Sequence, residues 1–313
     1  MKQRVLTGVV LLLILIAVFL AREFSSYVFD IFILTICFFA SYESSRLFRK
    51  MGLYNSWIIA MIYPILSYIC ILVSLLNKLP FYYAIILQVA LILLIIAISY
   101  FIFLIFKKQS QNELKTRSLK ISLSHYAFNK SVHTCFAMLY PSILLLLLTL
   151  LNHISLMYPS LNIENLDKLS FFALLIAFLI PILTDTFGMI VGSLFKGKKL
   201  CEKISPNKTI SGAIGGIVLS VLVMACVFVI FDSTAVFGEL FSNINLQIWH
   251  ILVLTVFASV ACECGDVFES WLKRRAGVKD SGEIFPAHGG ILDRFDSHAF
   301  NAVIILLFFL VLL

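Results

Sequence analysis

Charged residues are scarce in this chain. Only 13% of its 313 residues are Asp, Glu, Lys or Arg, whereas 61% are hydrophobic. A soluble globular domain carries about twice that share of charge. The composition therefore excludes an ordinary soluble protein and places the chain in a lipid bilayer.

Three sequence patterns are also missing. None of the seven cysteines forms a C-x-x-C pair, which argues against a zinc or thioredoxin-type site. No period-two alternation is long enough for the strands of a membrane barrel, and no internal repeat is evident. We therefore predict an all-α integral membrane protein with reduced, structural thiols.

Nine hydrophobic segments can cross a bilayer, because a spanning helix needs about 20 mostly apolar residues. We expect the first to be a retained helix rather than a signal peptide, since Ala21-Arg22-Glu23-Phe24 is a poor cleavage site and more spans follow. The nine predicted spans are residues 5–21, 27–42, 57–76, 84–106, 131–152, 169–190, 212–231, 248–268 and 297–313.

The net charge of +7 follows the spans. With the N-terminus in the cytosol, every Lys and Arg falls on the cytosolic side except Arg22, Lys78 and Lys168. The positive-inside rule thus predicts a cytosolic N-terminus and an external C-terminus. The charge indicates topology in a bacterial inner (cytoplasmic) membrane and gives no sign of nucleic-acid binding.

Polar residues divide the chain into three parts. Residues 1–106 form a four-span N-terminal membrane scaffold, in which Asp30 and Glu43 are ionisable but lie near the interfaces. Residues 107–130 form a cytosolic basic connector, either an interfacial helix or a solvated loop. Residues 131–313 form a five-span domain, and we expect the chemistry there.

Two polar clusters precede the main one. Asp185 lies near the cytosolic end of its span and should face the protein interior or a polar cavity. Ser205-Pro-Asn207-Lys208-Thr209 leads into a Gly-rich helix start, where free N–H groups and Lys208 could bind phosphate. Gly212 and Gly216 could instead form a G-x-x-x-G packing face.

The densest cluster runs from Gly265 to Asp296. Asp266, Glu269 and Lys273 share one helix face, and Asp293 and Asp296 are i,i+3 neighbours on the next helix. Two helix ends with facing carboxylates suit Mg²⁺, which binds hard oxygen ligands and leaves positions for phosphate. We therefore predict a Mg²⁺-dependent site that acts on phosphates, facing the cytosol.

Further residues of this cluster could bind a polyphosphate. Lys273, Arg274 and Arg294 would offset its negative charge. The Gly289-Gly290 pair would let the backbone approach a ligand closely. We expect His288 to contact substrate rather than to act as a general base.

These motifs resemble the signature of the bacterial phosphatidate cytidylyltransferase (CDP-diacylglycerol synthase) family. The resemblance rests on Ser270-Trp-Leu-Lys-Arg274, Lys279-Asp280, Phe285-Pro-Ala-His-Gly-Gly290 and Asp293-Arg-Phe-Asp296. It extends back through residues 205–209 and Asp185-Thr186, and more loosely to Arg4 and Tyr42-Glu43.

The resemblance implies a multi-span homodimer that condenses CTP with phosphatidic acid to give CDP-diacylglycerol and pyrophosphate. It implies Mg²⁺, with a second ion such as K⁺, held by Asp266 and Asp293, with Asp296 and Asp185 as further candidates. The site residues it suggests are Lys273, Arg274, His288 and Arg294 for catalysis and Ser205, Asn207, Lys208, Thr209, Lys279, Gly289 and Gly290 for substrate binding.

The chain departs from the family pattern in two stretches. Thr209-Ile-Ser211-Gly212 stands where the family usually has Thr-Trp-Glu-Gly, and Asp185-Thr-Phe-Gly-Met189 stands where it has Asp-Thr-Gly-Ala-Tyr. The acid expected at Ser211 and the aromatic residue expected at Met189 are therefore missing.

Two other functions fit parts of the pattern. A CTP-dependent polyprenol or phytol kinase would share the topology but transfer the γ-phosphate and release CDP. A transporter would also need many spans and buried acids, but transport sites lie near the membrane midplane, whereas this acidic cluster lies at one face.

Overall fold

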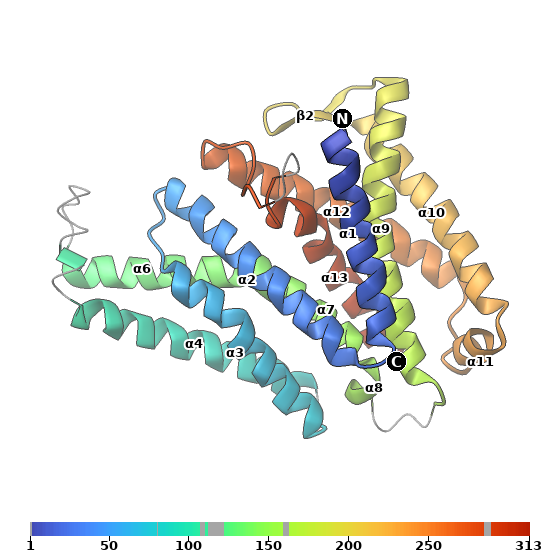
Figure 1. Ribbon diagram of the computed structural model, residues 1–313, viewed down its shortest axis with the longest axis horizontal. Coiled ribbons are helices and arrows are strands. Elements are labelled where there is room, and N and C mark those ends of the chain that lie inside the picture. The colour runs from blue at the N-terminus through green and yellow to red at the C-terminus, as the bar shows by residue number, and fades with distance from the viewer. Residues whose placement is uncertain (1, 80, 107–109, 112–121, 159–162, 285–288) are drawn as a thin grey trace.

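The computed structural model describes residues 2–79, 81–106, 110–111, 122–158, 163–284 and 289–313. Within them the regular secondary structure is helical apart from one short hairpin, which confirms the all-α prediction (Figure 1). The helices are α1 (Lys2–Arg22), α2 (Ser26–Lys50), α3 (Trp57–Leu76), α4 (Phe81–Ile105), α6 (Leu123–Met138), α7 (Leu144–Asn152), α8 (Ile154–Met157), α9 (Leu166–Phe195), α10 (Ile210–Asp232), α11 (Ala235–Asn243), α12 (Ile248–Arg275) and α13 (Leu292–Leu312).

Eight membrane-length apolar helices occur among the described residues, against the nine predicted. The first predicted span corresponds to α1, whose apolar part, Gly8–Arg22, is shorter than the others. The fifth begins at Leu123 rather than at residue 131, so the end of the predicted connector belongs to α6. The rest of that connector lies mostly outside the described residues.

α6 and α7 form one bent segment, Leu123–Asn152. The bend is the turn η1 (Leu139–Ile143), where Tyr140 has extended backbone angles of φ −113° and ψ 125° and the peptide bond to Pro141 is cis. Tyr140 packs edge-on against Phe268 of α12, with 4.9 Å between ring centroids. The bend thus joins the N-terminal half of the molecule to the helices of the polar cluster.

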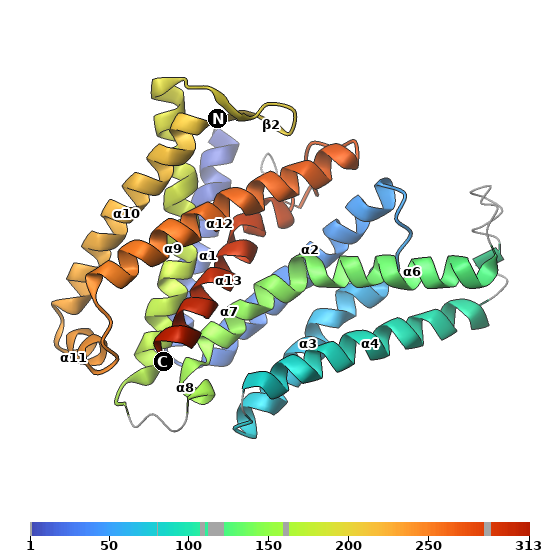
Figure 2. The ribbon, with the colours of Figure 1, turned by 180° about the vertical axis from the view of Figure 1, so that it is seen from behind.

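The helices form one bundle, within which α9, α10, α12 and α13 pack against one another (Figures 1 and 2). α2 contacts α1, α3 and α7, and it also touches α12 and α13. In both views the start of α1 and the hairpin lie at one end of the molecule, and the C-terminus lies at the other. The polar residues of the hairpin and of the last loop therefore gather at the end where α1 begins.

Glycines allow the closest helix crossings. A Cβ added to Gly212 would lie 2.6 Å from the carbonyl oxygen of Gly188, and one added to Gly216 would lie 2.7 Å from that of Thr184. The predicted G-x-x-x-G packing face is thus confirmed, against α9. At Gly265 a Cβ would lie 2.8 Å from the Asp296 carbonyl oxygen, so α12 and α13 also meet backbone to backbone.

The two strands are β1 (Lys199–Cys201) and β2 (Ser205–Thr209), which pair antiparallel. This hairpin was not predicted, because three and five residues are too few to show a period-two pattern. The Thr209 hydroxyl accepts a hydrogen bond from Gly212 N at 3.1 Å and caps α10. The cap fixes the direction in which β2 meets α10 and so fixes the position of Lys208.

A second buried polar cluster, away from this hairpin, surrounds Asp30 near the start of α2. Asp30 is fully buried and is bonded to His153 at 2.7 Å, to Tyr68 at 2.5 Å and to Asn152 at 2.9 Å. Arg22 donates to Asn152 at 2.7 Å. A carboxylate this deep is tolerated only when such donors replace water, and the cluster ties α1, α2, α3 and α7 together.

Candidate active site

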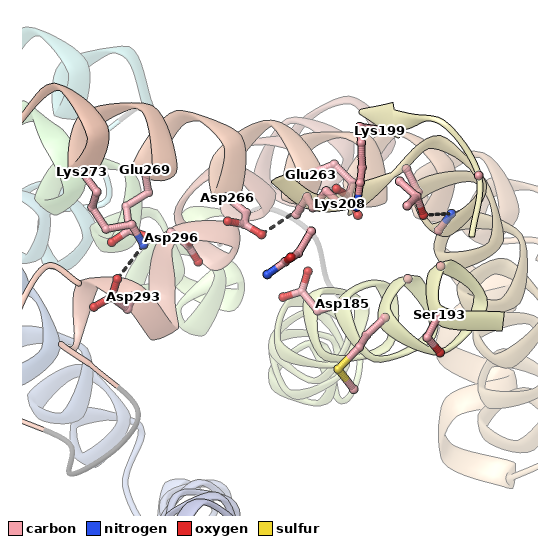
Figure 3. Close-up of a pocket in the computed structure, with 18 of the residues that line it drawn as sticks. Asp185, Ser193, Lys199, Lys208, Glu263, Asp266, Glu269, Lys273, Asp293 and Asp296 are labelled. Carbon is pink, nitrogen blue, oxygen red and sulfur yellow. Dashed lines mark hydrogen bonds and ion pairs between the residues drawn. The ribbon is translucent and has the colours of Figure 1, made fainter. Parts of the chain in front are cut away.

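A polar cavity of about 910 Å³ opens where α9, the hairpin, α12 and α13 meet. Seven acidic and five basic side chains line it. Figure 3 shows side chains of α12 and α13 facing those of α9 and β2 across this space. The charged lining residues are Asp185, Lys196, Lys199, Lys208, Glu263, Asp266, Glu269, Lys273, Asp280, Asp293, Arg294 and Asp296.

Lys208 bridges two carboxylates of α12. Its Nζ lies 2.6 Å from Glu263 Oε2 and 2.7 Å from Asp266 Oδ2. Glu263 and Asp266 are three residues apart, so both point from one helix face toward β2. Burial alone would lower the pKa of Lys208, but the charges of Asp266 and Glu263 outweigh burial and hold that pKa above its ordinary value. Lys208 is thus a permanent cation at the cavity wall.

Lys273 makes the matching bridge between α12 and α13. Its Nζ lies 2.8 Å from Glu269 Oε2, one turn away on α12, and 2.7 Å from Asp293 Oδ1 on α13. Glu269 is completely buried and Asp293 nearly so, with side-chain exposures of 0% and 6%. Water screens this ion pair little, so it holds the two helix ends together.

The second oxygen of Asp293 is held by the loop that precedes α13. Its Oδ2 accepts hydrogen bonds from Gly290 N at 2.7 Å, from Ser281 N at 2.9 Å and from Ser281 Oγ at 2.8 Å. Both oxygens of this carboxylate are therefore fixed in direction. A side chain constrained in this way is preorganised to bind a ligand.

Asp296 and Asp185 complete the acidic lining (Figure 3). Asp296 follows Asp293 by one turn of α13, and its Oδ1 accepts from Ser297 N at 2.7 Å. Asp185 projects from α9 on the opposite side of the cavity, as the sequence predicted for a carboxylate that must leave the apolar part of its span.

The donor set suits a hard divalent cation. Carboxylate oxygens from two helices line one cavity, and Glu269 Oε1 is a buried oxygen with no hydrogen-bond partner among the described residues. In the part of the chain that the structure describes, no three acidic, His or Cys groups are already close enough to form a complete metal site. A divalent cation held by one or two carboxylates keeps positions for substrate oxygens, which is the usual way that Mg²⁺ binds.

Comparison with known proteins identifies the family. The model of the cytidylyltransferase family matches residues 2–312, nearly the whole chain. The chain belongs to the cytidylyltransferase family.

Curated relatives match a shorter stretch. Proteins named phosphatidate cytidylyltransferase are similar to this chain over 127 residues, at 46% identity in Staphylococcus haemolyticus and 44% in Staphylococcus aureus. The match covers 41% of this chain and 45% of each relative. The chain thus spans about half the length of the curated relatives it matches.

Most predicted site residues of this cytidylyltransferase-family chain do line the cavity. They are Asp185, Asn207, Lys208, Thr209, Asp266, Lys273, Asp293, Arg294 and Asp296. Helical spacing predicted the shared faces on α12 and on α13, and the family resemblance joined them with Asp185 and residues 205–209.

Other predicted residues lie elsewhere. Arg274 is not among the lining residues and donates from Nε to the carbonyl oxygen of Ile204 at 3.3 Å. Lys279 is exposed, and Lys279 and Ser205 are not among the lining residues. His288 lies outside the described residues.

Gly289 and Gly290 were expected to approach a ligand, but they lie against carboxylates of the protein. A Cβ on Gly289, where φ is +83°, would lie 2.5 Å from Asp293 Oδ2, and one on Gly290 would approach the carboxylate of Glu43 closer still. Neither glycine is among the residues that line the cavity. Both make room for carboxylates of the protein itself.

The positions that depart from the family pattern have structural explanations. Ser211 Oγ accepts from Gly197 N at 3.2 Å and so ties the start of the hairpin to α10. Met189 lines the cavity and is 70% exposed, which leaves this wall of the site open.

Glu263 was absent from the predicted site, whereas Lys196 and Lys199 belong to the basic loop before Ser205 that was a candidate phosphate site. Glu263 lies three residues before Asp266, and that spacing could have indicated its place on the same helix face. The two lysines line the cavity only because the hairpin folds over it.

Proposed function

We propose that this chain is a phosphatidate cytidylyltransferase, which transfers a cytidylyl group from CTP to phosphatidic acid to give CDP-diacylglycerol and pyrophosphate. One observation carries the proposal in a chain of this family. Carboxylates of α12 and α13 face a single cavity, with Lys208 and Lys273 between them. Such a cavity can bind both a polyphosphate and the cation that accompanies it.

We assign Asp266 and Asp293 as the ligands of Mg²⁺. Asp296, Asp185 or Glu269 would bind a second ion such as K⁺. Mg²⁺ would supply charge neutralisation at the phosphates and at the departing pyrophosphate. Hydrogen bonds from the 281–290 loop already fix the direction of Asp293, so little reorganisation would be needed on binding.

The reaction needs orientation and charge rather than a proton shuttle. An oxygen of the phosphatidate phosphate attacks the α-phosphorus of CTP, a new P–O bond forms, and the bond to the β-phosphate oxygen breaks. Phosphatidate is already ionised, so no general base is required. Arg294, Lys196 and Lys199 line the cavity as cations that can hold the phosphates in line.

Lys208 and Lys273 would exchange partners during this step. Each is now neutralised by two carboxylates. If those carboxylates held a cation, each ammonium could donate to a phosphate oxygen instead. The two lysines thus keep the acidic site stable when it is empty and stabilise negative charge when it is filled.

The membrane setting follows from the charge distribution of the sequence. We place the start of α1 and the cavity on the cytosolic side of a bacterial inner membrane and the C-terminus outside, because the basic residues cluster at the cavity end. Phosphatidate would then reach the site at headgroup depth while CTP arrives from the cytosol. A homodimer is proposed on the sequence resemblance alone.

The test is an assay of the purified protein in mixed micelles. CTP, phosphatidic acid and Mg²⁺ should yield pyrophosphate and CDP-diacylglycerol in equal amounts, and the Asp293→Asn variant should lose most of this activity. Near-normal turnover in that variant would remove Asp293 from the metal site. Release of CDP with a phosphorylated lipid would instead favour the lipid-kinase alternative.

A further inference from the structure

Glu43 is a buried carboxylate of α2 that contacts the loop of the candidate active site. It is 1% exposed and lies 248 residues before Ile291 in the sequence. Its Oε1 accepts from Ile291 N at 3.1 Å, and its Oε2 accepts from Leu292 N at 2.8 Å and from Ser281 Oγ at 3.2 Å. Every described donor to Glu43 thus comes from Ser281 or from the start of α13.

The contacts at the start of α13 are divided between two carboxylates. Glu43 takes the N–H groups of Ile291 and Leu292, and Asp293 takes that of Gly290. The first N–H groups of a helix have no partner within the helix and carry partial positive charge. Because Glu43 uses that charge, this helix start is not available to a substrate phosphate, and its position depends on α2.

Ser281 links the two carboxylates directly. Its hydroxyl lies 2.8 Å from Asp293 Oδ2 and 3.2 Å from Glu43 Oε2, although it has a single proton to donate. Its backbone N–H also donates to Asp293. A change in the position of Glu43 is therefore transmitted to Asp293 through one residue.

The close fit around Glu43 requires glycine on two sides. A Cβ on Gly282 or Gly290 would fall well inside contact distance of the Glu43 carboxylate oxygens. The backbone of the loop thus wraps around this carboxylate on both sides. A carboxylate only 1% exposed is tolerated because these donors replace water.

We propose that Glu43 is a positioning residue, which holds the start of α13 and Ser281 so that the carboxylate of Asp293 faces the cavity at a fixed angle. Glu43 is not among the cavity-lining residues and acts through Asp293. The proposal rests on the proposed function for its effect on turnover. It also assigns a part of the site to the half of the chain that the sequence presented as scaffold.

The test compares Glu43→Gln with Asp30→Asn. Glutamine has the shape of glutamate but replaces one acceptor oxygen with an NH₂ group, which cannot accept from Ile291 N or Leu292 N. Asp30 is the matched control, because it is an equally buried acid of α2 whose partners, His153, Tyr68 and Asn152, do not belong to Ser281 or the start of α13.

We expect Glu43→Gln to lower kcat by about 10- to 100-fold, in the range that a displacement of about 1 Å produces. It should also raise the Mg²⁺ concentration needed for half-maximal rate and speed amide hydrogen exchange in the peptides that cover residues 281–296. Asp30→Asn should lower thermal stability but leave the Mg²⁺ requirement and that exchange as in the unchanged protein. Ser281→Ala should fall between the two.

Unchanged exchange in residues 281–296 of Glu43→Gln would overturn the proposal. So would a Mg²⁺ requirement and a kcat within about twofold of those of Asp30→Asn, because only a general packing defect would then remain. If the unchanged protein forms no CDP-diacylglycerol, the proposed function fails instead. The exchange measurement would still decide whether Glu43 holds the start of α13.

Discussion

Replacement of Lys208 by methionine tests the polar cavity most sharply. The variant keeps the unbranched chain as far as the ε-carbon but leaves Glu263 and Asp266 facing each other without the ammonium that lies 2.6 and 2.7 Å from them. Removing one partner of a buried ion pair costs about 3–5 kcal/mol, and an exposed pair contributes less than about 1 kcal/mol. With Glu263 13% and Asp266 29% exposed, we expect a loss of roughly 2 kcal/mol in the free energy of unfolding.

The effect on turnover has a separate origin. A hydrogen bond from a charged group to a substrate phosphate contributes about 1.5–3 kcal/mol. Its loss corresponds to a decrease of about 10- to 150-fold in kcat/KM for CTP. The assay is pyrophosphate release at several CTP concentrations, together with thermal unfolding in the same detergent.

A double variant separates the two effects. Lys208→Met with Glu263→Gln has the same formal charge at this position as the unchanged protein. We expect it to recover about half of the lost stability while its kcat/KM stays at least about tenfold low, because neighbouring charges couple but a substrate contact cannot be replaced. Full recovery of turnover would show that Lys208 only neutralises Glu263. If kcat/KM of Lys208→Met alone stayed within about threefold of that of the unchanged protein, Lys208 would not contact a substrate phosphate.

Three further predictions follow from the structure. Asp293→Asn should lower kcat by at least about 100-fold, as measured by pyrophosphate release, because it removes charge at the proposed metal site; a decrease below about tenfold would contradict this. Gly216→Val should lower the unfolding temperature in detergent by a shift worth about 1–3 kcal/mol through overpacking against the Thr184 carbonyl. Gly8→Ala is its control, because a Cβ added to Gly8 would have no atom within 4 Å. Equal stability of the two variants would contradict the α9–α10 packing. Chelation by EDTA should abolish turnover and added Mg²⁺ should restore it, whereas activity that survives exhaustive chelation would argue against a divalent ion.

Much of the fold could be predicted from hydropathy, but the helix ends could not. The predicted spans 169–190 and 248–268 continue as α9 to Phe195 and α12 to Arg275. A hydropathy window stops where polar residues begin, although the helix itself does not. Glu269 and Lys273, which line the cavity, lie on the part of α12 beyond the window.

Local spacing likewise predicted which residues of the candidate site share a helix face, but not which of them form ion pairs. The i,i+3 and i,i+4 spacing of Asp266, Glu269 and Lys273 predicted a shared helix face, and they do line one cavity. Which lysine meets which acid depends on the crossing of α12 and α13 at Gly265 and on the fold of the hairpin. Neither feature has a local sequence signal.

Glu43 is the clearest example of what a single sequence cannot give. It is one acid near the end of a span, and apart from the loose family resemblance at Tyr42-Glu43 nothing nearby in the sequence distinguishes it from an interfacial residue. Its partners, Ser281, Ile291 and Leu292, are more than two hundred residues away. Such contacts follow only from the packing of α2 against α13.

The central claim is that the cavity transfers the cytidylyl group of CTP to phosphatidate. The most direct measurement uses the purified protein, phosphatidic acid, Mg²⁺ and CTP labelled with ³²P at either the α- or the γ-phosphate. If the cavity transfers the cytidylyl group, the α-label enters the lipid product and the γ-label leaves as pyrophosphate. A lipid that carries the γ-label, with the α-label recovered as CDP, would contradict it.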